Sequence, residues 1–470
     1  MLFPELETRM PPLLLVTLVL VLSSLAYWQG RRRAFALSTG ASAAKLHSRP
    51  GYHGMLIALW CGLPALCIVA VWQMAADPLL TQLAMKGVAA AKGSLSPDQF
   101  NLLINDMRNL VAGNQVAREV DPLLQAAADQ YIGLQQVSSL ALAVVVLTTA
   151  IGAFLLMYKR IRPALRARNQ VERIVEIILT LCSTFAVFIT IGIVLSVLFE
   201  SIRFFQQVSL TDFLFGLQWS PQMAIRADQA GSSGSFGAVP VLTGTFLISG
   251  IAMAIAVPFG LMSAIYLSEY AGPKFRATVK PLLEILAGVP TVVYGFFAAL
   301  VVAPFIRDMG LLVGLPVSSE SALAAGLVMG IMIIPFVSSL SDDVINAVPQ
   351  SMRDGSYGLG ATKSETIKLV ILPAALPGIV GSVLLAVSRA IGETMIVVMA
   401  AGLAANLTVN PLQAVTTVTV QIVTLLVGDQ EFDSPKTLAA FALGLLLFVV
   451  TLVLNVIALY VVRKYREEYE

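Results

Sequence analysis

The sequence predicts an all-α, polytopic membrane protein with about nine transmembrane helices, and three observations lead to this fold class. Hydrophobic residues make up 57% of the 470 residues and charged residues only 12%, whereas about 25% charged residues are usual in soluble chains. The apolar residues form separate runs, each close to the ~20 residues that a helix needs to cross the hydrocarbon core. Charged residues gather between these runs. A water-soluble surface is therefore excluded.

Nine apolar runs are candidate spans. We expect helices, because backbone polar groups in lipid must be satisfied within the segment itself. The first run is followed by Arg31, Arg32 and Arg33, the reverse of the charge order in a signal peptide, so we expect it to be retained as a helix. The expected spans are residues 12–29, 55–76, 137–158, 174–199, 239–268, 282–304, 322–340, 376–402 and 437–462.

The positions of Lys and Arg predict the orientation. About two thirds of the 30 basic residues lie in one alternating set of loops, namely 30–54, 159–173, 271–281, 341–375 and 463–470. Loops rich in Lys and Arg remain cytoplasmic, so the N-terminus is expected outside and the C-terminus inside, in a bacterial inner membrane. The basic loop after the third span is expected to lie beside anionic lipid headgroups. A net charge of +2 without a basic stripe gives no indication of nucleic-acid binding.

The chain is expected to contain two domains. Residues 1–170 carry three spans and a long outward loop, 77–136, in which apolar residues recur at helical spacing, so a helical hairpin is expected outside the membrane. Residues 171–470 carry the other six spans. Several of these contain helix breakers, and broken helices at membrane depth are tolerated where they line a cavity. This favours a transporter over a simple anchor. The breakers are Pro258, Gly288, Pro290, Gly295 and Pro335.

A cytoplasmic segment after the seventh span combines glycines with a short amphipathic stretch. It reads Asp354-Gly-Ser-Tyr-Gly-Leu-Gly360-Ala-Thr-Lys-Ser-Glu-Thr-Ile-Lys-Leu-Val370-Ile-Leu-Pro373. The glycines permit a tight turn and the close approach of another backbone. Ile367, Val370 and Ile371 can form one apolar stripe against a partner, and Pro373 is expected to end the element.

This segment resembles the coupling loop of ABC-transporter permeases, in which Glu-Ala-Ala is followed by three residues, Gly, nine residues and Ile-x-Leu-Pro. The matching positions are Asp354, Gly355, Ser356, Gly360, Val370, Leu372 and Pro373. The resemblance implies that the loop seats in a groove of an ATP-binding subunit and transmits its closure. The alternative is an ordinary interfacial loop.

The chain contains no GxxxxGK[ST] phosphate-binding loop, so it is not expected to bind or hydrolyse ATP. ATP and Mg would be used by the separate ATP-binding subunit. We therefore expect a non-catalytic chain without a cofactor. The three cysteines lie in apolar runs without the spacing of a zinc site, and a metal site is not expected.

The eighth span contains the charged sequence Ser388-Arg389-Ala-Ile-Gly392-Glu393-Thr394-Met395. Ionisable groups at bilayer depth cost at least about 2.5 kcal/mol each on insertion scales and usually mark a function. Arg389 and Glu393 are four residues apart, so they should share a helix face and could pair. A guanidinium offers forked donors that match phosphate oxygens, and we interpret Arg389 as lining an anion path. A structural ion pair is the alternative.

This charged sequence resembles the signature Gly-Arg-Ala-x-Gly-Glu-Thr-Met of phosphate-specific permeases, with Ser388 in place of the first glycine. Residues 236–245, 268–270 and 286–295 agree with the same family, and the match is to its PstC-type member over about 174–470. The resemblance implies a type I importer core at about 239–462 and a substrate path that includes Arg389, Glu393, Ser388 and Thr394. The three-helix domain resembles an extension of some longer members.

The resemblance also implies partners. These are a second, PstA-type permease, a homodimeric ATP-binding subunit and a periplasmic phosphate-binding protein. Three alternatives stay open at this point: a permease for another oxyanion such as molybdate or sulfate, a secondary transporter or channel that works alone, and a regulatory protein that senses phosphate through residues 1–170.

Overall fold

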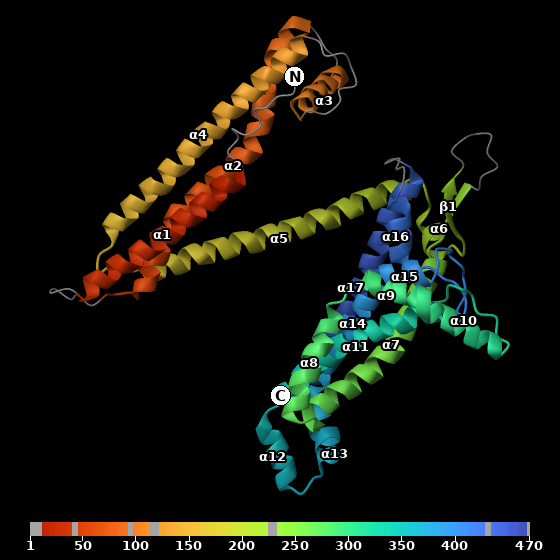
Figure 1. The fold of residues 1–470 in the computed structure, drawn as a ribbon. Coiled ribbons are helices and arrows are strands. Elements are labelled where there is room, and N and C mark those ends of the chain that lie inside the picture. The colour runs from red at the N-terminus through yellow and green to blue at the C-terminus, as the bar shows by residue number, and fades with distance from the viewer. Residues whose placement is uncertain are drawn as a thin grey trace. The chain divides into compact units, whose positions relative to one another are not determined.

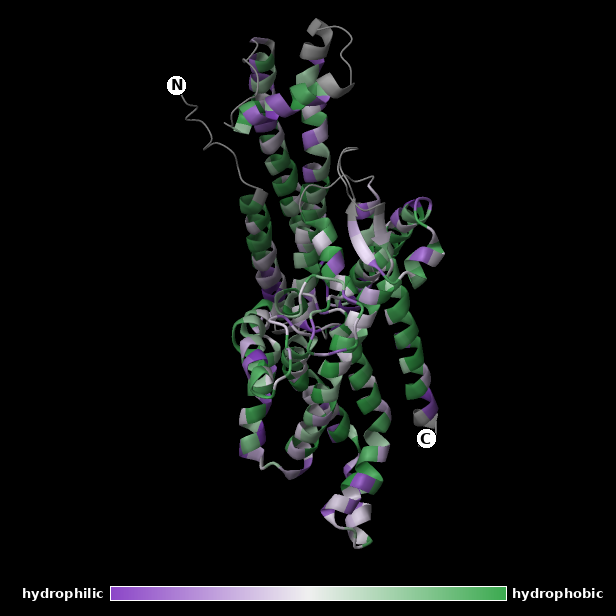
Figure 2. Ribbon diagram, turned by 90° about the vertical axis from the view of Figure 1, so that its right-hand side faces the viewer, coloured by the Kyte–Doolittle hydropathy of each residue, from purple (hydrophilic) through white to green (hydrophobic). Residues whose placement is uncertain are grey.

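The computed structural model describes residues 12–39, 46–92, 97–112, 122–223, 233–427 and 434–467. Within these ranges, nine helices are long and apolar enough to cross a membrane, which confirms the predicted fold class (Figure 1). Figure 2 shows hydrophobic residues along the long helices and hydrophilic residues mainly at helix ends and connections. Contacts divide the chain into two units, Met1–Val187 and Phe188–Glu470. The division lies inside one helix that begins near residue 170, so the sequence-based boundary at 170/171 remains a prediction.

The first unit is built around three long helices, α1 (Pro12–Thr39), α2 (Pro50–Lys92) and α4 (Pro122–Arg160), which pack against one another. Its other elements are α3 (Pro97–Ala112) and the first half of α5 (Ala167–Phe205). α2 has 43 residues, or about 64 Å at 1.5 Å per residue, which is twice the hydrocarbon thickness. The helix therefore continues well beyond a single bilayer crossing.

The loop 77–136 of this unit differs in detail from the helical hairpin that we expected there. The ends of α2 and α4 extend into residues 77–136 and enclose the amphipathic α3. Met85, Met107 and Leu124 are buried in the shared cluster, and Asp77 accepts hydrogen bonds from Arg108 Nη2 and Tyr131 Oη, both at 2.7 Å. Residues 93–96 and 113–121 of the loop lie outside the described residues.

The second unit contains the other elements. They are α6 (Leu210–Phe215), β1 (Trp219–Met223), β2 (Ser233–Phe236), α7 (Val239–Ile265), α8 (Pro273–Ala287), α9 (Thr291–Phe297), α10 (Ala303–Leu312), α11 (Ala322–Ala347), α12 (Gln350–Gly358), α13 (Lys363–Thr366), α14 (Leu372–Ile391), α15 (Met395–Ala400), α16 (Val418–Leu426) and α17 (Pro435–Glu467). β1 and β2 form an antiparallel hairpin in which Trp219 pairs with Phe236, a small exception to the all-helical prediction.

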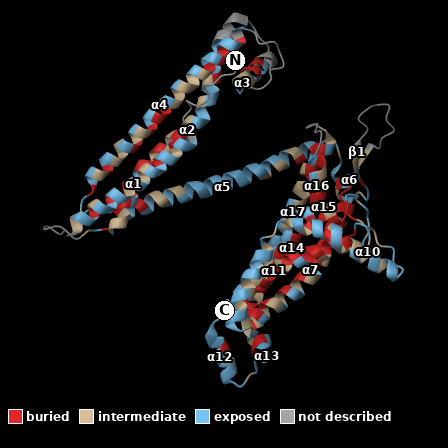
Figure 3. Cartoon of the chain, viewed as in Figure 1, coloured by how far each residue is buried: buried red, intermediate tan, exposed pale blue. Residues whose placement is uncertain are grey.

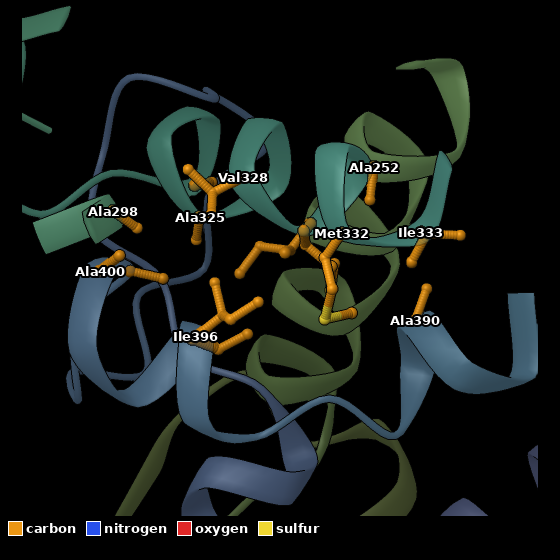
Figure 4. Close-up of a cluster of buried hydrophobic side chains, with 14 of the residues drawn as sticks. Ala252, Ala298, Ala325, Val328, Met332, Ile333, Ala390, Ile396 and Ala400 are labelled. Carbon is orange, nitrogen blue, oxygen red and sulfur yellow. The ribbon is translucent and has the colours of Figure 1, made fainter. Parts of the chain in front are cut away.

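The core of the second unit lies between α7 and α11, against α14 and α15. Figure 4 shows small and branched side chains from these helices pointing toward one another, among them Ala252, Val328 and Ile396. Gly330 of α11 faces α7, and a Cβ atom there would lie 3.0 Å from the carbonyl oxygen of Ala252. Small residues at such positions let helix backbones approach closely, which stabilises helix pairs in lipid.

Two predicted spans have wrong boundaries, for the same physical reason. The sixth was expected as one helix over 282–304, but α8 ends at Ala287 and the apolar helix restarts at Thr291 and runs to Leu312. The eighth was expected at 376–402, but the helix spans Lys363–Ile391. Pro290 and Gly392 lie at these breaks. Hydropathy is insensitive to such residues, whereas helix hydrogen bonding is not.

Pro373 does not end a helix as expected, because a π-helical turn precedes it. Residues Ile367–Ile371 form this turn, in which the Leu372 N–H donates to the Ile367 carbonyl. The wider turn relieves the clash between a proline ring and the preceding turn and accommodates the missing donor. Pro373 therefore lies within the first turn of α14, and α13, the π-helical turn and α14 form one continuous helix.

Candidate functional site

Arg389 lies in the last turn of α14 and points away from the core of its own chain. Its side chain is exposed, and its Cζ atom lies 5.7 Å from the ring centroid of Phe336 on α11. In the part of the chain that the structure describes, no carboxylate lies within ion-pair distance of Arg389. The structure therefore leaves open the prediction that Arg389 lines an anion path, with its guanidinium exposed.

The expected pairing of Arg389 with Glu393 is wrong. Gly392 caps α14, so Glu393 lies in the following turn and the four-residue spacing no longer places both side chains on one helix face. Glu393 Oε1 instead accepts hydrogen bonds from the backbone N–H groups of Met395 at 3.1 Å and Ile396 at 3.5 Å. The carboxylate thus caps the first turn of α15, where a negative charge is favourable.

The other expected path residues stabilise the same break. Ser388 Oγ donates to Asn455 Oδ1 of α17 at 3.3 Å, and Thr394 Oγ1 donates to the Gly392 carbonyl at 3.3 Å. Thr419 Oγ1 of α16 donates to the Glu393 carbonyl at 3.0 Å. The break between α14 and α15 is therefore stabilised by hydrogen bonds to α16 and α17 and by one within the turn itself. Irregular backbone at membrane depth is tolerated where it is buried in protein or lines a water-filled cavity.

Sequence reasoning missed a buried polar network next to this break. The Gln421 side chain of α16 accepts a hydrogen bond from Trp219 Nε1 at 2.8 Å and donates to the Leu403 carbonyl at 2.8 Å. Its Nε2 also lies 3.3 Å from Thr416 Oγ1. The only available signal was the cluster of Thr and Gln in residues 416–421, which interrupts an apolar stretch. The network fastens the non-helical segment 401–417 to the β-hairpin.

The coupling-loop residues form a helical hairpin at the far end of α14, about 25 Å from Arg389 at 1.5 Å per residue. α12 is exposed along most of its length (Figure 3). Asp354 Oδ1 accepts from Gln350 Nε2 at 3.0 Å, and Gly355 is exposed. Gly360 has φ +88°, which L side chains rarely adopt. Thr362 and Glu365 form a capping box that starts α13.

The apolar stripe expected for a partner lies instead largely inside this chain. Ile367 and Ile371 are buried against Ile345 and Ile379, because the π-helical turn rotates them toward α11 and α14. Val370 and Leu372 are half-buried. The apolar side chains that the hairpin exposes are Met352, Tyr357, Leu359 and Leu369.

A charged cluster that sequence reasoning did not single out joins α8 to α11. Asp342 is almost fully buried and accepts hydrogen bonds from Arg276 Nη2, at 3.0 and 3.1 Å, and from Lys280 Nζ at 2.9 Å. Lys280 also donates to Asp343 at 2.8 Å. The hydrogen bonds to Asp343 and Asp342 raise the pKa of Lys280 above its ordinary value. The two positive side chains of this cluster, Arg276 and Lys280, therefore neutralise its two carboxylates.

Two family descriptions match the chain. Residues 16–189 match "Phosphate ATP-binding cassette transporter", and residues 256–467 match "Binding-protein-dependent transport system inner membrane component". YqgH of Bacillus subtilis, a probable ABC transporter permease protein, is 32% identical over 281 residues, which cover 59% of this chain and 86% of that protein. PstC of Mesorhizobium japonicum, a phosphate transport system permease protein, is 34% identical over 248 residues, 49% of this chain and 74% of that protein.

The helical membrane core and its coupling-type hairpin define a class of protein, the permease subunit of an ATP-binding cassette importer. Such subunits are non-catalytic membrane components and have no expected cofactor. They work with an ATPase and a binding protein. The similarity to relatives of which this chain covers 86% and 74% is more specific: the chain belongs to the PstC-type family of ABC-transporter permeases.

Proposed function

We propose that this chain forms one half of a phosphate-translocating channel in a bacterial inner membrane. The other half would be a PstA-type permease, with a homodimeric ATP-binding subunit on the cytoplasmic side and a periplasmic phosphate-binding protein on the outer side. The relatives named PstC support phosphate as the substrate. The excess of Lys and Arg in one set of loops supports an outer N-terminus and a cytoplasmic C-terminus.

The exposed guanidinium of Arg389 is the observation that carries the proposal. A charge at bilayer depth is costly unless it is paired or reaches water, and Arg389 has no carboxylate partner within the described residues. A phosphate ion in the path would supply the missing negative charge and would accept the forked donors of the guanidinium. Arg389 would then bind the anion while the path is open.

Glu393 would act differently from the partner of Arg389 that its four-residue spacing indicated. Because its carboxylate already accepts two backbone N–H groups, it would keep the turn between α14 and α15 in place. This turn would keep Arg389 next to the break between α14 and α15. Ser388 and Thr394 would stabilise the same turn through their own hydrogen bonds.

Uptake of labelled phosphate by the reconstituted four-component complex tests the role of Arg389. Arg389→Ala should abolish uptake, and Arg389→Lys should retain only a fraction of it, because an ammonium keeps the charge but not the forked geometry. Arg307→Ala is a matched control, since Arg307 is also exposed but pairs with its neighbour Asp308. Undiminished uptake by Arg389→Ala would defeat the proposal.

Competition separates phosphate from other oxyanions. Excess unlabelled phosphate should suppress uptake of the label by the wild-type complex, whereas equal concentrations of molybdate or sulfate should leave it nearly unchanged. Stronger competition by molybdate or sulfate would assign the permease to that anion instead. Copurification of an ATP-binding subunit and a PstA-type permease with the tagged chain tests the proposed assembly independently.

A further inference from the structure

The coupling hairpin is fastened to the membrane helices through a single buried side chain of α12. Arg353 is the only residue of this helix that is buried, and its neighbours Met352 and Asp354 are exposed. Long cationic side chains are rarely buried without a partner. A buried arginine in an otherwise solvent-exposed helix therefore requires a specific set of contacts.

Arg353 connects α12 to the ends of two membrane helices. Its Nη2 and Nε atoms lie 3.0 and 3.3 Å from Glu269 Oε1, in the π-helical turn Tyr266–Tyr270 that ends α7. Its Nη2 also donates to the Ile345 carbonyl at 2.8 Å, and its Nη1 donates to the Val348 carbonyl. These two carbonyls lie at the C-terminal end of α11, and that of Ile345 also accepts the backbone N–H of Val348 at 3.3 Å.

Both charges of this pair are withdrawn from solvent. The side chain of Arg353 is 9% exposed and that of Glu269 is 8% exposed. A further contact reaches the end of α7, since Lys363 Nζ of α13 lies 4.9 Å from the ring centroid of Tyr270. Within the hairpin, Ser356 Oγ of α12 lies 2.9 Å from the buried Thr366 Oγ1 of α13. The hairpin is thus held to the end of α7 without any covalent connection between them.

The three membrane helices next to the hairpin are connected to it in different ways. α12 follows α11 directly along the chain, and α13 continues into α14, so these two helices must respond to a displacement of the hairpin. α7 has no such covalent link to the hairpin. It is joined through Glu269, which lies 84 residues before Arg353 in the sequence. A buried ion pair with its remaining donors satisfied holds one geometry and resists separation.

We propose that the Arg353–Glu269 pair makes the coupling helix, the end of α7 and the end of α11 move as one body, and that it is required for ATP hydrolysis by the partner to drive transport. The inference rests on the proposed function, because it assumes an ATPase that pushes on the hairpin. Arg353 and Glu269 are positioning residues. They touch neither the anion nor ATP.

The ratio of phosphate transported to ATP hydrolysed, measured in proteoliposomes that contain the whole complex and the binding protein, tests this proposal. Glu269→Gln keeps the shape of the side chain and removes its charge. It should lower the ratio about tenfold, within the range typical of coupling between two sites, while the ATPase subunits remain bound at wild-type stoichiometry. Arg353→Lys, which keeps the charge but not the fork, should lower the ratio less.

A double variant keeps the test valid if the single change prevents assembly. Glu269→Gln with Arg353→Gln leaves no unpaired charge in the buried site, so it should assemble more readily than either single neutral variant. It should still show the lowered ratio. Glu172→Gln is the matched control, because it removes an Arg–Glu pair that is solvent-exposed, with Arg168 Nε 2.6 Å from Glu172 Oε1. Its ratio should equal that of the wild type.

The outcomes are distinct. A purely structural role would reduce uptake and ATP hydrolysis in parallel, and an unchanged ratio in both the Glu269→Gln and the double variant would overturn the inference. A wild-type complex that does not transport phosphate, or that copurifies with no ATPase, would instead overturn the proposed function. A lowered ratio with intact assembly supports the pair as the mechanical link.

Discussion

Two arginines of the second unit, Arg353 and Arg389, show how environment separates a mechanical residue from a ligand-binding one. Arg353 is buried, and its donors reach one carboxylate and two backbone carbonyls. Arg389 is exposed and lies only over an aromatic ring, without an acidic partner among the described residues. The first is satisfied by its own chain. The second can be satisfied by a solute. Removal of Arg353 should therefore lower stability strongly, whereas removal of Arg389 should abolish phosphate uptake with little change in stability.

Replacement of Arg353 should have the largest effect on stability. Arg353→Ala leaves the Glu269 carboxylate buried without its cationic partner, and such broken pairs cost about 3 to 5 kcal/mol. The free energy of unfolding of the purified complex, measured by equilibrium denaturation in detergent, should fall by that amount. Arg168→Ala, which removes an exposed member of an ion pair, should change it by less than about 1 kcal/mol. Equal losses in the two variants would remove the distinction between the two arginines.

The cluster around Asp342 allows a second comparison of a buried with an exposed ion pair, because Lys280 contacts one buried and one exposed carboxylate. The side chain of Asp342 is 2% exposed and that of Asp343 is 63% exposed, and both bind Lys280. Asp342→Asn should lower the free energy of unfolding by about 1 to 3 kcal/mol, since it leaves buried hydrogen-bonding groups poorly matched. Asp343→Asn should cost less than about 1 kcal/mol.

The pH dependence of these variants follows from the raised pKa of Lys280. In the unfolded chain the pKa of lysine is about 10.4, and in the folded chain that of Lys280 is higher. Below about pH 10.4 the stabilising contribution of Lys280 is therefore complete. It is lost as the pH rises through the folded pKa. The wild type and Asp342→Asn should therefore differ by a constant amount near neutral pH. The difference should shrink above about pH 10.4, where the pairing of Asp342 with Arg276 remains. Convergence at acid pH instead would assign the effect to a different group.

Replacement of Arg389 should have the smallest effect on stability. Arg389→Ala removes an exposed side chain with one ring contact, and surface changes of this kind are usually within about 0.5 kcal/mol. The same variant should nevertheless lose phosphate uptake. A fall in the free energy of unfolding as large as that of Arg353→Ala would identify Arg389 as structural, whatever its transport activity.

Much of the site could be located from the sequence, because its two parts are continuous segments. The spacing from Asp354 to Pro373 needs no tertiary information, and neither does an arginine in an apolar run. The local geometry was harder to predict. Gly392 ends α14 before Glu393. The rule that residues four apart share a helix face therefore does not hold between Arg389 and Glu393, and the ion pair that it allowed is absent. The stripe of Ile367 and Ile371 was assigned to a partner, although the chain itself covers it.

The number and approximate positions of the spans follow from the sequence alone, because the transfer of an apolar segment into lipid depends mainly on that segment's own composition. The contacts that hold the coupling hairpin to α7 and the buried polar network around Gln421 do not. Glu269 and Arg353 are 84 residues apart, and Trp219 and Gln421 are 202 residues apart. Nothing in the sequence around any of these four residues indicates its partner. Only the tertiary fold brings the partners together, and their burial in a low-dielectric interior makes each pairing strong.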